Sequence, residues 1–214
     1  MTRRLLVLAC SATKTKEPGR ISAYQRYDGP LWQTLRATDP ERTKTRVAFV
    51  SARFGFRCAT TTWIENYNEP MTAQRAAEMI SGGMTGKWPK AKPTKRITMG
   101  CGVNAWAEIV HLTYYGERPF TDVAIAGGRL YLDVMRNLVE LFKQSHWDGF
   151  ENTPPYVKPE ARVTEINGSI GIMRKELREW VLETPVTRSA IAAANRTATA
   201  PTQRELFSNG GSLS

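Results

Sequence analysis

The sequence has few of the residues that bind soft metal ions or form disulfides. Its 214 residues include three cysteines, Cys10, Cys58 and Cys101, and two histidines, His111 and His146. No two cysteines form a CxxC pair, and so small a set of side chains does not predict a zinc site. The odd number of cysteines does not suggest a disulfide framework either. No acidic cluster indicates a magnesium site, so we expect no metal and no cofactor.

The sequence also lacks long apolar segments. No hydrophobic run approaches the roughly 20 residues of a membrane span, and the apolar part of the opening MTRRLLVLACS is too short for a convincing signal peptide. We therefore expect a cytoplasmic protein with no membrane partner. With 41% hydrophobic residues and six tryptophans, the chain can bury the core of one large domain.

Acidic residues are outnumbered by basic ones, 20 against 30, which gives a formal net charge of +10. Lysine and arginine neutralise phosphates, so such a chain is a candidate nucleic-acid binder, although a generically basic protein is the alternative. The segment 87–96, KWPKAKPTKR, places cations around a tryptophan on which a base can stack. A solvated linker is the other interpretation. We predict DNA rather than RNA as the partner, with backbone contacts from Lys87, Trp88, Lys90, Lys92, Lys95 and Arg96.

Short apolar runs alternate with amphipathic segments along the first 183 residues. Strands are expected at 4–9, 46–51, 96–100, 122–127 and 162–166, and helices at 29–37, 72–81, 104–115, 129–144 and 170–183. This alternation predicts parallel βαβ units and one three-layer, Rossmann-like α/β domain with a mostly parallel sheet over residues 1–183. Residues 184–214, rich in Ala, Thr, Ser, Asn and Gly, are expected to form a flexible tail.

Three of the expected strands end abruptly at small or polar residues, in VLACSATK at 7–14, FVSARFGF at 49–56 and AIAGGRLY at 124–131. Ligands of open α/β sheets bind beyond the carboxyl ends of the strands. The loop WIENYNEPM at 63–71 adds groups suited to reading a base edge and to acid–base work. Ordinary turns and core packing explain each segment taken alone. Together they predict one polar crevice with these candidates: Cys10, Ser11, Lys14, Ser51, Arg53, Glu65, Tyr67, Asn68, Glu69, Gly127, Gly128, Tyr131 and Asn167.

The order of the motifs ACSATK, YDGPLW, VSARFGF, ENYNEPM, AGGRLY and NGSIGIMRKEL resembles an uncharacterised phage and bacterial domain family, over about residues 5–182. That layout is distantly similar to the YaaA peroxide-stress family, which is associated with DNA binding. The CSxxK start resembles a motif of archaeosine synthase and related tRNA-base enzymes. The resemblance highlights Cys10, Ser11, Lys14, Tyr27, Gly29, Ser51, Gly55, Tyr67, Gly127, Tyr131 and Gly171.

Two positions depart from the family pattern, Asn68 where Asp is frequent and Phe54 where Tyr is usual. If that Asp serves as the general base, its role shifts to Glu65 or Glu69 here. In the tail, QRELF at 203–207 is similar to the peptide that binds bacterial sliding clamps, through Gln203, Leu206 and Phe207. A chance match is the alternative.

Together these features predict an enzyme that flips a base, often a modified one, out of DNA and cleaves or exchanges its N-glycosidic bond. Tyr67 or Tyr131 would stack on the base, while Lys14, Ser11 and Arg53 would hold phosphate or the leaving base. Glu65 or Glu69 would activate water or stabilise charge at C1′, with Lys14 and Asn68 as further catalytic candidates. The alternatives are a non-catalytic DNA-binding protein and an enzyme acting on free nucleotides or nucleosides.

Overall fold

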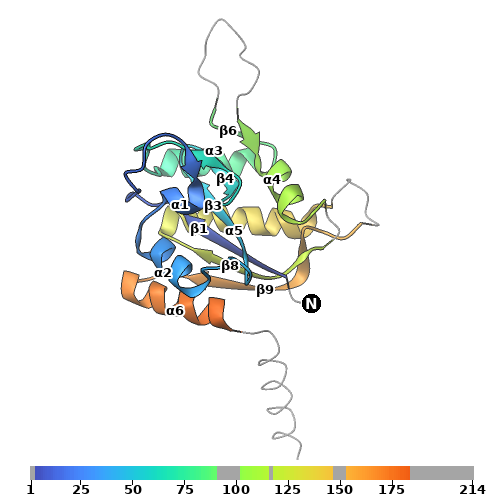
Figure 1. The fold of residues 1–214 in the computed structure, drawn as a ribbon. Helices are drawn as coiled ribbons and strands as arrows, with labels where there is room; N and C mark the ends of the chain where they lie inside the picture. The colour runs from blue at the N-terminus through green and yellow to red at the C-terminus, as the bar shows by residue number, and fades with distance from the viewer. Residues whose placement is uncertain (1–2, 91–101, 116–117, 147–152, 184–214) are drawn as a thin grey trace, which may run out of the picture. The chain divides into compact units, whose positions relative to one another are not determined.

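A computed structural model describes residues 3–90, 102–115, 118–146 and 153–183. Its centre is a five-stranded sheet in the order β4-β3-β1-β8-β9 (Figure 1). Strands β3, β1, β8 and β9 run parallel, and β4 pairs with β3 antiparallel. Their bounds are β1 Arg4–Ala9, β3 Arg46–Ser51, β4 Gly55–Cys58, β8 Phe120–Ala126 and β9 Val157–Ile166.

Helices cover both faces of this sheet, and the sequence of β1 shows why. Leu5 and Val7 face a core closed by α3, α4 and α5, whereas Leu6 and Leu8 face a core closed by α1, α2 and α6. Side chains alternate between the faces of a strand, so a continuous apolar run supplies both cores. The result is the predicted three-layer α/β architecture. The helices are α1 Ala23–Arg26, α2 Pro30–Thr38, α3 Ala73–Gly82, α4 Ala105–Leu112, α5 Arg129–Gln144 and α6 Ile170–Leu182.

Local signals set several of these boundaries. The Thr72 hydroxyl accepts a hydrogen bond from the Arg75 amide at 3.2 Å and caps α3, as the sequence predicted. Asn104 caps α4 in the same way, accepting from the Ala107 amide at 2.9 Å. Both bonds satisfy amides that the first turn of a helix leaves unpaired.

The main departure from the expected strands is β4. Gly55, at φ +67°, lies just after β3 and lets the chain reverse into an antiparallel edge strand. Strand β9 begins at Val157, earlier than expected, and tolerates Pro159 because it lies at the edge of the sheet. The strand expected at 96–100 and the tail at 184–214 lie outside the described residues.

Two small antiparallel sheets flank the central one. Strand β2, Ile21–Ser22, pairs with β5, Trp63–Ile64, and β6, Lys87–Trp88, pairs with β7, Val103–Asn104. By its internal contacts, Met1–Leu182 forms one compact unit. Across the described ranges, no helix combines the length and apolar character needed to span a membrane.

A buried ionic cluster fastens α6 to the amino ends of the strands. The Asp122 carboxylate pairs with Arg4 at 3.1 Å and with Arg162 at 2.6 Å. It also accepts a hydrogen bond from the indole of Trp180 at 3.3 Å, while the Arg4 guanidinium lies 3.8 Å from the Trp180 ring centroid. Asp122 therefore neutralises two arginines and anchors the last helix.

Candidate active site

Side chains from the carboxyl ends of β1 and β3 and from the start of α5 meet in one cluster, as the strand-end motifs predicted. The hydroxyl groups of Tyr27 and Tyr67 lie 2.5 Å apart, and Ser51 Oγ lies 2.8 Å from the Tyr67 hydroxyl. Cys10 Sγ lies 3.1 Å from the hydroxyl of Tyr131. We call Cys10, Tyr27, Ser51, Tyr67 and Tyr131 the tyrosine cluster.

Close packing of the backbone at the ends of β1, β3 and β8 brings the residues of the tyrosine cluster together. The Cys10 amide donates to the Val50 carbonyl at 2.9 Å, which ties the exit of β1 to β3. At the exit of β8, a Cβ on Gly127 would lie 2.7 Å from the Cβ of Ala9. This close approach requires glycine, and it brings Tyr131, in the first turn of α5, next to Cys10.

Lys14 extends the cluster from the loop after β1. Its Nζ donates to the Ser11 carbonyl at 3.0 Å and lies 4.3 Å from the ring centroid of Tyr67. Burial lowers the pKa of the Lys14 amine below its ordinary value, because desolvation penalises its charged form. Among the described carboxylates, none lies within ion-pair distance of this amine. Lys14 is thus a partly desolvated amine beside aromatic rings.

Arg26 shapes the loop that carries Lys14, and the sequence analysis did not single it out. This arginine is fully buried and donates to the carbonyls of Thr15, Glu17 and Gly19 at 3.0, 2.7 and 2.6 Å. Its hydrogen bonds fold the chain around the guanidinium and so fix the base of the Lys14 loop. No local pattern distinguishes Arg26 from a solvent-exposed arginine, because its carbonyl partners are defined only by the folded loop.

Ser11 follows Cys10 and is half-buried. A Cβ on Gly29 would lie 2.2 Å from Ser11 Oγ, so Gly29 leaves the space that this side chain fills. The carbonyl of Ser11 rather than its hydroxyl contacts Lys14. Ser11 therefore helps to position the amine.

The phenols of the cluster are held as neutral groups. Burial raises the pKa of Tyr27, Tyr67 and Tyr131 well above the ordinary value, and the neighbouring Cys10 sulfur acts in the same direction. All three therefore keep their protons at neutral pH and can donate hydrogen bonds. The sequence analysis predicted that Tyr67 or Tyr131 stacks on a base. Tyr67 is only 9% exposed, so its ring is not open for stacking, whereas the half-buried Tyr131 is more accessible.

At the rim of the cluster, Glu69 is held between two arginines. Its oxygens lie 3.4 Å from Arg53 and 3.3 Å from Arg75, and Arg75 also donates to the Ala52 carbonyl at 3.0 Å. Both carboxylate oxygens of Glu69 are thus engaged, which suits a positioning role better than that of a free base. Glu65 and Asn68, the other candidates of this loop, are exposed.

Asn167 and Gly128 border a neighbouring hollow of about 310 Å³ at the start of α5. The Asn167 amide donates to Glu165 at 2.6 Å, and Arg136 donates to both oxygens of that carboxylate at 2.6 and 2.7 Å. These contacts hold the Asn167 side chain in an ionic network with Glu165. Its link to the tyrosine cluster is through the Gly127–Gly128 turn.

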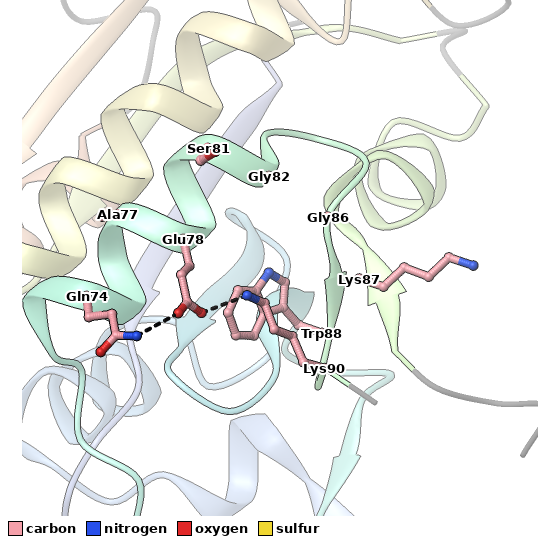
Figure 2. Close-up of a pocket in the computed structure, with 9 residues that line it drawn as sticks. All are labelled: Gln74, Ala77, Glu78, Ser81, Gly82, Gly86, Lys87, Trp88 and Lys90. Atoms are coloured by element: carbon pink, nitrogen blue, oxygen red, sulfur yellow. Dashed lines mark hydrogen bonds and ion pairs between the residues drawn. The ribbon is translucent and has the colours of Figure 1, made fainter. Parts of the chain in front are cut away.

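The basic segment at 87–96 is described as far as Lys90. A hollow of about 610 Å³ lies between α3 and β6, where Glu78 accepts hydrogen bonds from Lys90 at 2.7 Å and from Gln74 at 3.1 Å (Figure 2). Lys87 is exposed and points away from α3 (Figure 2). The predicted residues Lys92, Lys95 and Arg96 lie outside the described part of the chain, as do Gln203, Leu206 and Phe207 of the tail motif.

Trp88 corrects the prediction of an exposed ring for stacking on bases. Its side chain is 6% exposed and packs in the core, where Gly55 leaves room for it: a Cβ on Gly55 would lie 2.9 Å from the indole. Its carbonyl accepts a hydrogen bond from Arg57, which also pairs with Glu108 at 3.2 Å. Burial of the large indole outweighs the polar character of its sequence neighbours.

Across the described residues, no group of three or more His, Cys, Asp or Glu side chains is arranged to hold a metal ion. Comparison of the chain with protein-family models, with curated proteins and with solved structures gave no match.

Proposed function

We propose that this protein acts on the N-glycosidic bond of a nucleotide in DNA, cleaving it or exchanging the base. The observation that carries the proposal is the partly desolvated Lys14 amine, which no described carboxylate neutralises, 4.3 and 5.9 Å from the ring centroids of Tyr67 and Tyr27. A desolvated lysine is a nucleophile near neutral pH, because more of its amine is uncharged. Crevices at the carboxyl ends of parallel strands are the usual ligand sites of this architecture.

In the proposed reaction the uncharged Lys14 amine attacks C1′ of a flipped-out nucleotide. The new N–C1′ bond forms as the C1′–base bond breaks, and the base leaves with the bonding electrons and takes up the proton that the amine loses. Attack by water on the resulting adduct frees the amine and leaves an abasic site, whereas attack by another base exchanges the base. Tyr131, half-buried and next to Cys10, is assigned to contact the flipped base.

The remaining residues serve this reaction by position. Glu69 aligns Arg53 and Arg75 at the rim, where two guanidinium groups suit the phosphates flanking the target nucleotide. Water activated by Glu65 is the alternative chemistry, since that carboxylate is exposed and no ion pair engages it in the described part of the chain.

The test uses DNA duplexes of varied base content, including hypermodified phage DNA, incubated with the purified full-length protein. Released bases are identified by mass spectrometry, and abasic sites are counted. The adduct converts to an imine when its C1′–O4′ bond breaks and the proton on the nitrogen passes to O4′. Borohydride added during the reaction should reduce this imine, and so link protein to DNA. We expect Lys14→Met to abolish both base release and crosslinking, and the control variant Lys16→Met, in the same loop, to keep both.

Three other results of this experiment would change the proposed mechanism or the proposed function. If base release depends on Glu65 and no crosslink forms, the proposed function stands, but the reaction uses water activated by the Glu65 carboxylate in place of the Lys14 amine. Binding without release across the whole panel would refute the enzyme and leave a DNA-binding protein. Release of the base from free nucleosides but not from DNA would indicate an enzyme that acts on small-molecule substrates.

A further inference from the structure

Another polar hollow, of about 330 Å³, lies at the amino ends of β1 and β3. It is lined by Arg4, the first residue of β1, by Arg3 just before it, and by residues 42–46, RTKTR, which lead into β3. Cys10 and Ser51 lie at the opposite ends of the same two strands. This amino-edge hollow is therefore separate from the tyrosine cluster, and the function proposed above does not use it.

A buried carboxylate fixes one wall of the hollow. Asp39, 2% exposed, accepts hydrogen bonds from the amides of Thr43 at 3.0 Å and Lys44 at 3.1 Å. The Arg42 amide donates to the Asp39 carbonyl at 3.1 Å, and Arg42 adopts a left-handed conformation at φ +57°. The loop is held in shape without a ligand.

Positive charge in the hollow is only partly compensated. Of the lining cations, Arg4 pairs with Asp122. The guanidinium groups of Arg3 and Arg46 lie 5.2 and 4.7 Å from the centroid of one ring, that of Tyr114. Burial lowers the pKa of Arg3 to about 10, with Arg46 and Arg118 adding repulsion. The seven residues that line the hollow include no acidic side chain; the Asp39 carboxylate lies behind the lining, on the amides of Thr43 and Lys44.

An unpaired hydroxyl lies in the same wall. Thr45 is 7% exposed, and its Oγ1 is buried with no hydrogen-bond partner in the described structure. Buried polar atoms are almost always hydrogen-bonded, because desolvation of an unpaired hydroxyl is costly. Because this Oγ1 atom is shielded from solvent, the Thr45 side chain has to turn toward the hollow for an oxygen acceptor bound there to satisfy it.

We propose that the amino-edge hollow binds a phosphate group, with Arg42, Lys44 and Arg46 supplying charge and the Thr45 hydroxyl a hydrogen bond. Guanidinium and hydroxyl donors match the oxygens of a phosphate, and an anion relieves the repulsion between the crowded cations. The hollow exceeds the size of inorganic phosphate, so the phosphate belongs to a larger ligand, either a free nucleotide or the backbone of DNA.

Binding of pyrophosphate, of a mononucleotide and of a short DNA duplex is measured by calorimetry at constant ionic strength, with chloride as the reference anion. We expect saturable pyrophosphate binding that weakens at least tenfold in the double variant Lys44→Gln/Arg46→Gln. The matched control, Lys175→Gln/Arg178→Gln on the exposed face of α6, should bind like the wild type. Equal affinity of the two double variants, or no binding beyond that of chloride, would overturn the proposal.

Thr45→Val separates a ligand role from a structural one. Valine has nearly the same shape and removes the unpaired hydroxyl, so the variant should be at least as stable as the wild type without ligand, yet bind pyrophosphate more weakly. A less stable variant with unchanged pyrophosphate affinity would contradict the assignment of Thr45. Displacement of the duplex by pyrophosphate identifies the DNA backbone as the source of the phosphate, and tighter binding of the mononucleotide identifies a free nucleotide.

Discussion

The hydroxyl of Tyr67 joins the two most buried polar side chains of the tyrosine cluster. It lies 2.5 Å from the hydroxyl of Tyr27 and 2.8 Å from Ser51 Oγ, and both of these partners are fully buried. Ser51 Oγ also accepts hydrogen bonds from the amides of Arg53 and Phe54, at 3.1 and 3.3 Å. Removal of the Tyr67 hydroxyl therefore affects Tyr27 most, because it takes away the 2.5 Å hydrogen bond of the Tyr27 hydroxyl and leaves that hydroxyl only its interaction with Ser51.

From this geometry, Tyr67→Phe should lower the free energy of unfolding by about 1–3 kcal/mol, the cost of depriving a buried hydroxyl of its closest hydrogen-bond partner. Tyr27→Phe should cost less, about 0.5–1.5 kcal/mol, because Tyr67 keeps Ser51 as a partner. In the double variant neither tyrosine hydroxyl remains to lack the other, and Ser51 Oγ keeps its hydrogen bonds from the Arg53 and Phe54 amides. The loss of stability for the double variant should thus be smaller than the sum of the single losses, with a coupling of about 0.5–3 kcal/mol.

Urea denaturation followed by tryptophan fluorescence measures all four proteins of this cycle. Tyr115→Phe serves as the control, because that side chain is 63% exposed and its hydroxyl remains solvated when other residues change. Combined with Tyr67→Phe, it should give additive effects within about 0.5 kcal/mol. If the losses of unfolding free energy in Tyr27→Phe and Tyr67→Phe also add up to the loss in the double variant, the shared hydrogen bond is refuted.

Three further predictions test other parts of the structure. Asp122→Asn should lower the free energy of unfolding, measured by urea denaturation, by about 3–5 kcal/mol, since it removes the charge of the buried carboxylate that pairs with Arg4 and Arg162; a loss below about 1 kcal/mol, the range of exposed pairs, would contradict this. Gly29→Ala should cost about 0.5–1.5 kcal/mol, because its Cβ would lie 2.2 Å from Ser11 Oγ and force that side chain out of its present rotamer, and Ser11→Ala in the same chain should recover part of the loss. Burial lowers the pKa of Lys14, so the unfolded chain holds this proton more tightly and stability rises as pH rises from the lowered pKa to 10.5. Lys14→Met should reduce the rise of the melting temperature with pH, and an unchanged rise would show that Lys14 is not desolvated.

The parts of this fold that follow from local sequence were predicted well. Strand β1 is a run of apolar residues that supplies two cores at once, and its abrupt end at Cys10 indicated the edge where ligands bind. Cys10, Ser51 and Tyr131 meet there because parallel strands bring their carboxyl ends to one edge.

What the sequence did not reveal depends on interactions between distant segments. Trp88 lies among lysines and prolines and was interpreted as exposed, yet the space beside Gly55, far away in the sequence, buries its indole. Arg26 is indistinguishable from a surface arginine until the 15–19 loop folds around it. Glu69, a candidate general base in the sequence, is engaged by Arg75, which no motif indicated.

The net charge of +10 was the strongest reason to expect DNA, but composition does not say where that charge lies. Near the tyrosine cluster, Arg53 and Arg75 share Glu69, and on α3 Glu78 compensates Lys90. At the amino ends of β1 and β3, by contrast, Arg42, Lys44 and Arg46 form no ion pair with a described carboxylate. Uncompensated cations contribute most to the salt dependence of DNA binding. If DNA reaches the amino edge, Lys44→Gln/Arg46→Gln should therefore reduce the salt slope by about one for each phosphate that is no longer neutralised, whereas Lys14→Met should abolish chemistry with little change in that slope.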